Sequence, residues 1–143
     1  MEPEMDLATM TSEDLAELAT GRDLWLKAPA LGELGRRFPR AAIPIAVAAV
    51  HDPDELVAST GLRVWAHLEP EAARSFMVEA VDSCSLRMLE IMVENLAVDD
   101  PVADRHWDGL LARIAKRLRR PESDTELYLA DLFFRQYPHL RDL

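Results

Sequence analysis

Apolar residues recur along this sequence with the period of an α-helix, and acid–proline pairs mark where the periodic segments begin. Asp52–Pro53, Glu69–Pro70 and Asp100–Pro101 each put an acidic residue before a proline. A helix N-terminus favours both, because proline loses no hydrogen bond there and the acid faces the positive end of the helix dipole. The clearest apolar stripe consists of Trp107, Leu110, Leu111, Ile114 and Leu118.

The sequence predicts an all-α fold in one domain over residues 1–143. No segment alternates between apolar and polar residues with the period of two that a half-buried strand shows. A length of 143 residues fits one domain with its own core. Residues 21–29, which hold Gly21 and Pro29, are interpreted as an irregular or short helical connection. The expected helices span residues 12–20, 30–38, 41–51, 53–68, 70–81, 84–97, 101–119 and 124–137.

Polar residues at the expected helix starts supply further caps. Thr11 with Asp14, and Asp52 with Glu55, have the spacing of a capping box. From residue 30 onward, the links between expected helices are one to four residues long. Consecutive helices should therefore pack antiparallel. Stacked helix pairs and a compact helical bundle both satisfy this condition.

Three segments repeat the same order of apolar helix, tight polar turn and second apolar helix. They cover residues 42–68, 73–96 and 110–134. The first two turns follow "AAVHD" and "EAVDS", which places Asp52 and Asp82 thirty residues apart. A period of this length is typical of helical solenoids.

In these features the chain resembles the HEAT-repeat family, especially its short bacterial form. The residues that carry the resemblance are Pro44, Asp52–Glu55, Leu56, Val57, Asp82, Leu86 and Arg87. The resemblance implies a short α-solenoid, with three antiparallel helix pairs over residues 41–137 and capping helices within residues 1–40. It also implies Asp–Arg contacts between repeats. A continuous ladder is not expected, because Ala58 and Arg120 stand where the pattern would place an Arg and an Asp.

The chain is acidic, with a net charge of −10. Residues 1–100 hold 19 acids and 8 bases, so the acidity belongs to the first two-thirds. Such a field repels nucleic acid and anionic lipid and attracts basic proteins. The longest apolar run, residues 41–50, carries Pro44 and is too short to span a bilayer. With one cysteine, Cys84, and no apolar leader in "MEPEMDLATM", the chain is expected to be cytoplasmic.

No pattern of catalytic or metal-binding residues stands out. The four histidines, at positions 51, 67, 106 and 139, never occur four residues apart, and Cys84 has no second cysteine. We therefore expect no metal, no cofactor and no catalytic residues. The serines beside Cys84 are interpreted as turn caps. Trp25, Trp65 and Trp107 are expected in the core.

A basic run near the end of the chain has two interpretations. It contains Arg113, Lys116, Arg117, Arg119 and Arg120. Such a run could hold the phosphates of a nucleic acid. It also ends an expected helix, where cations complement the dipole. The acidity of the whole chain favours the second interpretation, so no nucleic-acid binding is expected.

The sequence is compatible with two classes of function. The first is a non-catalytic protein–protein interaction module, such as an immunity protein, an antitoxin or an adaptor. The second is an enzyme or nucleic-acid-acting protein whose site is assembled from distant helices. In HEAT-like folds the second helix of each pair lines the inner face, and its polar positions here are Arg63, His67, Arg87, Glu90, Glu94, Asp131 and Arg135.

Within that set, Glu90 and Glu94 lie one helical turn apart. No Lys or Arg follows either residue at the spacing that would neutralise it. A basic partner protein would relieve this repulsion, which predicts that the face carrying both glutamates meets the partner. The alternative is that this face is only solvated.

Overall fold

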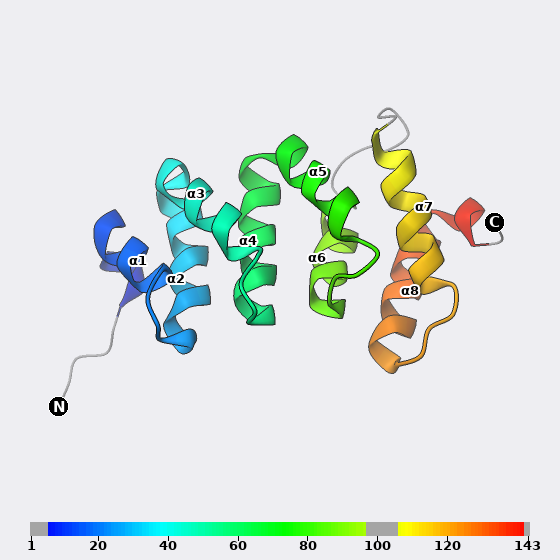
Figure 1. The fold of residues 1–143 in the computed structure, drawn as a ribbon, viewed down its shortest axis with the longest axis horizontal. Coiled ribbons are helices and arrows are strands. Elements are labelled where there is room, and N and C mark those ends of the chain that lie inside the picture. The colour runs from blue at the N-terminus through cyan, green and yellow to red at the C-terminus, as the bar shows by residue number, and fades with distance from the viewer. Residues whose placement is uncertain (1–5, 97–105, 142–143) are drawn as a thin grey trace. The chain divides into compact units, whose positions relative to one another are not determined.

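The computed structural model describes residues 6–96 and 106–141, and within them the chain is all-α, with no strand. The all-α prediction is confirmed (Figure 1). Two short 3-10 helices, Leu7–Thr9 and Pro138–Leu140, lie near the two ends of the described chain. The α-helices are α1 (Ser12–Ala19), α2 (Leu24–Arg37), α3 (Pro39–Ala49), α4 (Glu55–Leu68), α5 (Pro70–Ala80), α6 (Leu86–Leu96), α7 (His106–Leu118) and α8 (Asp124–Gln136).

The chain divides into two compact units. Unit 1 comprises Met1–Ala73 and unit 2 comprises Arg74–Leu143. The expectation of one domain over residues 1–143 stays a prediction, and so does the choice between a solenoid and a bundle.

Helix α2 begins earlier than the sequence predicted. Residues 21–29, interpreted as an irregular or short helical connection, are helical from Leu24 onward and belong to α2, which contains Pro29. The irregular alternative was therefore wrong for residues 24–29, and no separate short helix is present there. Asp23 caps it by accepting a hydrogen bond from the backbone N–H of Trp25 (3.0 Å). Pro29 lies on the exposed side of the helix, while Ala28 and Leu31 are buried. Packing of the apolar face outweighs the local penalty of the proline.

The turn before α4 also departs from the prediction. Asp54, not Asp52, caps the helix, since its Oδ1 accepts from the backbone N–H groups of Leu56 and Val57 (both 3.0 Å). Asp52 stabilises the turn instead. Its Oδ1 accepts from the N–H of Asp54 (2.9 Å), and its Oδ2 accepts from Lys27 Nζ on α2 (2.9 Å). The proposed Asp52–Glu55 capping box was therefore wrong, whereas Thr11 does accept from Asp14 N–H (3.2 Å).

We predict that Asp52 makes the stability of the protein depend on pH. The bond from Lys27, followed by that from the Asp54 N–H, holds the pKa of Asp52 below its ordinary value of 3.8. A carboxylate with a lowered folded-state pKa stabilises fully above its unfolded pKa and loses that contribution as the pH falls through the folded value. Asp52→Asn should therefore lower the unfolding free energy by about 1–2 kcal/mol near neutral pH, and by less below about pH 4.

Urea unfolding of wild type and variant across this pH range measures the effect. Lys27→Gln removes the same ion pair by changing its other partner. In a protein that carries Lys27→Gln, the pH-dependent loss of unfolding free energy caused by Asp52→Asn should therefore be smaller. A difference between wild type and Asp52→Asn that stays constant from about pH 7 to about pH 3 would contradict the prediction.

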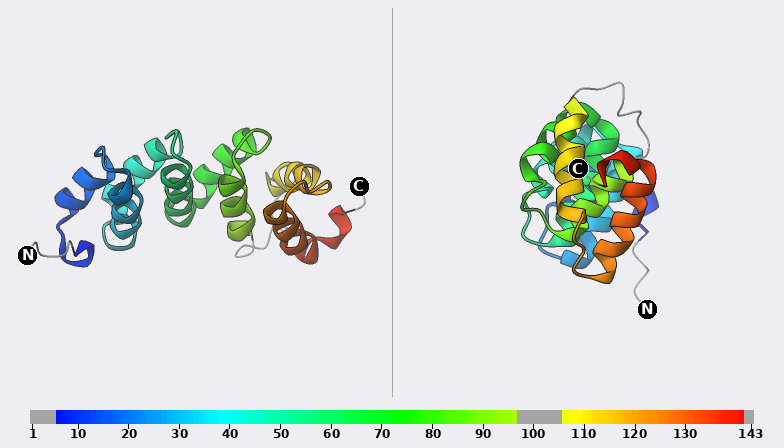
Figure 2. Two further views of the ribbon diagram at one scale, coloured as in Figure 1. Left: turned by 90° about the horizontal axis from the view of Figure 1, so that it is seen from below. Right: turned by 90° about the vertical axis from the view of Figure 1, so that its right-hand side faces the viewer.

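Unit 1 is built on close contact between alanine-rich helices. Helices α3 and α4 lie side by side, and α2 packs on both (Figures 1 and 2). At Gly61 of α4, an added Cβ would lie 2.8 Å from Ala49 Cβ and 2.9 Å from the Ala46 carbonyl oxygen of α3. At Gly35 of α2, it would lie 2.7 Å from a methyl of Val64. The fully buried leucines of this unit are Leu15, Leu31, Leu34 and Leu62.

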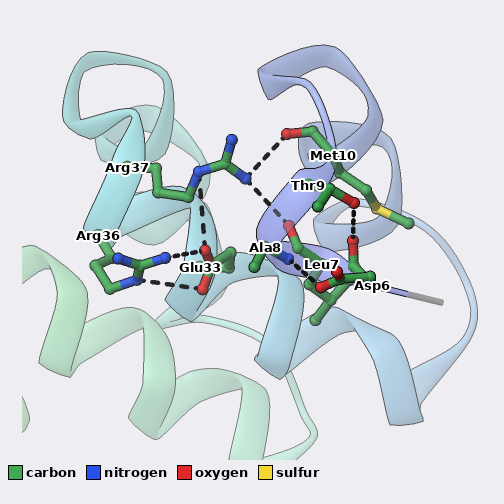
Figure 3. A network of polar contacts seen from close by, with 8 residues as sticks. All are labelled: Asp6, Leu7, Ala8, Thr9, Met10, Glu33, Arg36 and Arg37. Carbon is green, nitrogen blue, oxygen red and sulfur yellow. Dashed lines mark hydrogen bonds and ion pairs between the residues drawn. The ribbon is translucent and has the colours of Figure 1, made fainter. Parts of the chain in front are cut away.

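A polar network joins the start of the described chain to the end of α2 (Figure 3). Arg37 Nη1 donates to the carbonyls of Leu7 (3.1 Å) and Met10 (3.0 Å). Glu33, one turn earlier, forms ion pairs with Arg37 (3.8 Å) and with Arg36. The 3-10 helix Leu7–Thr9 is thereby held against α2.

Unit 2 buries the stripe that the sequence predicted on α7. Leu110, Leu111, Ile114 and Leu118 are all buried. The side chain of Trp107, which the prediction included, lies outside the described residues. On α8 the buried residues are Leu129, Ala130, Phe133 and Phe134, followed by Tyr137. Leu127, on the same helix, lies outside this buried set and is 58% exposed.

The core positions expected for the tryptophans agree only in part with the structure. Trp25, expected in the core, is 89% exposed at the start of α2. Trp65 is half-buried, and its Nε1 donates to Glu69 (3.1 Å). Trp25 lies in the first turn of α2, whereas the buried residues of this helix begin at Ala28. Its side chain therefore lies outside the part of α2 that packs into the core.

Candidate functional site

A groove of about 420 Å³ opens between α6 and α8 in unit 2. These two helices are in contact. Its apolar lining comes from Val93, which is buried, and Leu132, which is half-buried. Its polar lining comes from Glu94, Arg135 and Gln136, all of which are exposed. The groove is therefore an apolar strip with charged and amide groups along its edge.

The local sequence explains how each helix reaches the groove. On α6, Leu89, Met92 and Val93 are buried, and Glu94 follows directly at the edge of that buried face. On α8, Phe133 and Phe134 turn into the core with their rings 5.3 Å apart, which leaves the preceding Leu132 at the groove. Ser123 fixes the start of α8, because its hydroxyl accepts from the N–H of Glu126 (3.1 Å).

The charged side chains at the groove do not cancel one another. Arg135 forms an ion pair with Asp131, one turn earlier on the exposed side of α8. Glu94, on the other wall, adds a second carboxylate. Together the three side chains carry one net negative charge. An apolar strip bordered by a net acid suits a segment that presents an aliphatic or aromatic residue together with a cation.

The structure brings some of the predicted partner-binding residues together and leaves others apart. Glu94 and Arg135 line the groove, and Asp131 binds Arg135. Arg87, exposed, and Glu90, half-buried, lie on α6 outside the groove lining. Arg63 and His67 are exposed one turn apart on α4, in unit 1.

Val93, Leu132 and Gln136 were missed. Val93 is an apolar residue that belongs to the buried face of α6, and no pattern in the sequence selects Leu132 or Gln136. Each of the three lies next to a predicted partner-binding residue, namely Glu94, Asp131 or Arg135, and this was the signal that could have found them.

The turn aspartates that carried the family resemblance both bind a cation from another helix. Asp52 binds Lys27, as described above. Asp82 binds Arg113 of α7, with Arg113 Nε donating to Oδ1 at 3.2 Å. The Arg113 guanidinium holds the pKa of Asp82 below its usual value. Arg87, the residue expected to join such contacts, is exposed in the first turn of α6.

Much of the basic run on α7 is engaged in contacts within unit 2. Arg113 Nη1 also donates to the Val78 carbonyl (2.6 Å). Arg117 Nη1 donates to the carbonyls of Val81 (3.0 Å) and Cys84 (2.8 Å), after the end of α5. Arg119 donates to the Leu140 carbonyl through Nε (3.3 Å) and Nη2 (3.2 Å). Lys116 and Arg120 are exposed.

Cys84 lies within this cluster. Burial raises the pKa of its thiol above the ordinary value of 9.0, although the Arg117 guanidinium opposes the shift. The thiol is therefore protonated, and weakly nucleophilic, at neutral pH. Ser85 beside it serves as a cap, because its hydroxyl accepts from the Met88 N–H (3.3 Å).

Within residues 6–96 and 106–141, no three His, Cys, Asp or Glu side chains are grouped so that they could hold a metal ion. None of the helices described there combines the length and apolarity needed to cross a membrane.

Compared with family models, with curated proteins and with solved structures, the chain matches none of them. Its function must therefore be inferred from its own residues and their contacts.

Proposed function

We propose that this chain is a non-catalytic protein–protein interaction module whose α6–α8 groove binds a partner segment with apolar and basic side chains. The groove lined by Val93, Leu132, Glu94 and Arg135 is the observation that supports the proposal. The mix of apolar and charged lining fits a protein surface better than a small polar substrate. An immunity protein, an antitoxin or an adaptor in the cytoplasm would use such a groove on a basic protein.

The proposal includes the HEAT-like interpretation of the three helix pairs α3–α4, α5–α6 and α7–α8. The shared role of Asp52 and Asp82 supports it, because residues thirty positions apart each join a turn to another helix. The basic run gives little support to the alternative of a nucleic-acid-acting protein. Arg113, Arg117 and Arg119 already donate to backbone carbonyls of the chain itself.

The groove predicts different effects for two glutamates on one helix. Once a partner has been identified by co-purification, Glu94→Lys should slow its association and reduce the salt dependence of the rate, because Glu94 borders the groove. Glu90→Lys makes the same charge change one turn earlier, outside the groove lining, and should have the smaller effect. Stopped-flow association at two salt concentrations measures both.

Leu132→Ser tests the apolar strip in the same assay. It should weaken equilibrium binding by about 1 kcal/mol or more, since a partner side chain would lose its apolar contact. Tyr128→Ser, an exposed position on the same helix outside the groove lining, is the control. Unchanged binding by both Leu132→Ser and Glu94→Lys would exclude the groove as the partner site.

A further inference from the structure

An exposed apolar group lies in unit 1 and shares no residue with the groove. Trp25 is 89% exposed, its neighbour Leu24 is 51% exposed, and Leu56 is 46% exposed. We call these three residues the end patch. Single exposed apolar residues are ordinary, but a cluster that includes a tryptophan marks an interaction surface, because tryptophan anchors many protein interfaces.

Helix alignment places the three residues of the end patch at the same end of unit 1. Helices α2 and α4 are in contact, and Gly35 lies against Val64. Because the two helices run parallel, the residue spacing that sets Gly35 beside Val64 also sets Lys27 level with Leu56. The bond from Lys27 to Asp52, just before α4, confirms this alignment. Leu24 and Trp25 in the first turn of α2 therefore lie at the same end as Leu56 in the first turn of α4 (Figure 1).

Acidic side chains border the end patch. Its two helix starts carry four acids and two bases, namely Asp23, Asp52, Asp54, Glu55, Arg22 and Lys27. Lys27 is bound to Asp52. Within residues 6–96 and 106–141, Glu55 makes no ion pair, and it is exposed. The border is thus net negative, as is the chain at −10.

We infer that the end patch docks a partner segment in which leucine-like residues and lysine or arginine recur at helical spacing. The apolar residues of the segment would cover Trp25 and Leu56, while its cations would meet the acidic border. A second copy of this chain fits poorly, because it would set two acidic borders against each other. This inference rests on the proposed function, to which it adds a second docking surface.

Tryptophan fluorescence can report directly on the end patch. In the full chain carrying Trp65→Phe and Trp107→Phe, Trp25 is the single tryptophan. The probe is a synthetic amphipathic helical peptide of leucine and lysine. A scrambled peptide of the same composition, and a leucine–glutamate peptide, serve as controls. We expect a saturable blue shift of Trp25 emission with the amphipathic basic peptide only.

Binding of the labelled peptide, measured by anisotropy, tests which residue anchors it. Trp25→Ser should weaken binding at least about tenfold, the usual effect of removing a tryptophan anchor. Tyr128→Ser, which removes an exposed aromatic from unit 2, should leave it unchanged. Glu55→Gln should weaken binding at low salt more than Glu17→Gln, which removes the same charge from the exposed side of α1.

The experiments distinguish failure of the end-patch inference from failure of the proposed function. No blue shift, an equal shift with the scrambled peptide, or equal losses for Trp25→Ser and Tyr128→Ser would overturn the inference. A blue shift on raising the protein concentration alone would assign the patch to self-association and would also overturn it. Peptide binding that depends on Leu132 but not on Trp25 would leave the proposed function standing. If the identified partner depended on neither residue, both proposals would fail.

Discussion

Phe133→Ala is expected to lower the free energy of unfolding by about 3–5 kcal/mol. Phe133 is fully buried on α8, and its ring lies 5.3 Å from that of Phe134 and 5.2 Å from that of Tyr137. Truncation would remove the apolar contacts of the ring and leave a cavity that two large neighbours cannot close. Urea unfolding followed by circular dichroism measures the loss.

Tyr128→Ala on the same helix is the matched control for this prediction. Tyr128 is 61% exposed, so its truncation should change the unfolding free energy by less than about 0.5 kcal/mol. Similar losses in the two variants would mean that the buried face of α8 is assigned incorrectly.

Two glycine-to-alanine substitutions should have opposite signs. Gly61→Ala is expected to destabilise the protein by about 1–3 kcal/mol, because the new methyl would press on α3. Two of the three atoms it meets, the Ala46 carbonyl oxygen at 2.9 Å and the Val50 nitrogen at 3.1 Å, are backbone and cannot move alone. Gly32→Ala on α2 meets nothing within 4 Å and should stabilise by about 0.5–1 kcal/mol.

The comparison separates packing from helix propensity. Both positions lie inside helices, so propensity alone predicts stabilisation in each case. Thermal or urea unfolding of the two variants gives the signs. Stabilisation by Gly61→Ala would show that α3 and α4 can separate without loss, contrary to their close contact.

The sequence predicted the helices well because the signals for them are local. Prolines, caps and periodic apolar residues occur within a few positions of each helix end, and among the described residues the structure places six helix starts within two residues of the prediction. The expected start at residue 101 lies outside the described residues. The errors have local causes as well. Pro29 was interpreted as a break because nothing in the sequence shows how strongly Ala28 and Leu31 pack. Asp52 and Asp54 compete for one cap, and the contact with Lys27 decides between them.

The candidate site was harder to predict because it depends on distant residues. Exposed polar positions on α6 and α8 were predictable from the apolar period, which is why Glu94, Asp131 and Arg135 were selected correctly as exposed. The groove itself requires α6 to approach α8, so Val93 and Leu132 gain their role only from tertiary contact. The exposure of Trp25 also depends on tertiary structure, because no other element among the described residues covers it. The residue type alone does not predict this.

The guanidinium of Arg117 has a consequence for the order of events during synthesis. It donates to the carbonyls of Val81 and Cys84, which precede it by 36 and 33 residues. At the usual rate of translation, these carbonyls are added to the chain about 2–7 s before their donor. They lack this donor until Arg117 has been made, so the link between α5 and α6 reaches its final form only after most of α7 has been made.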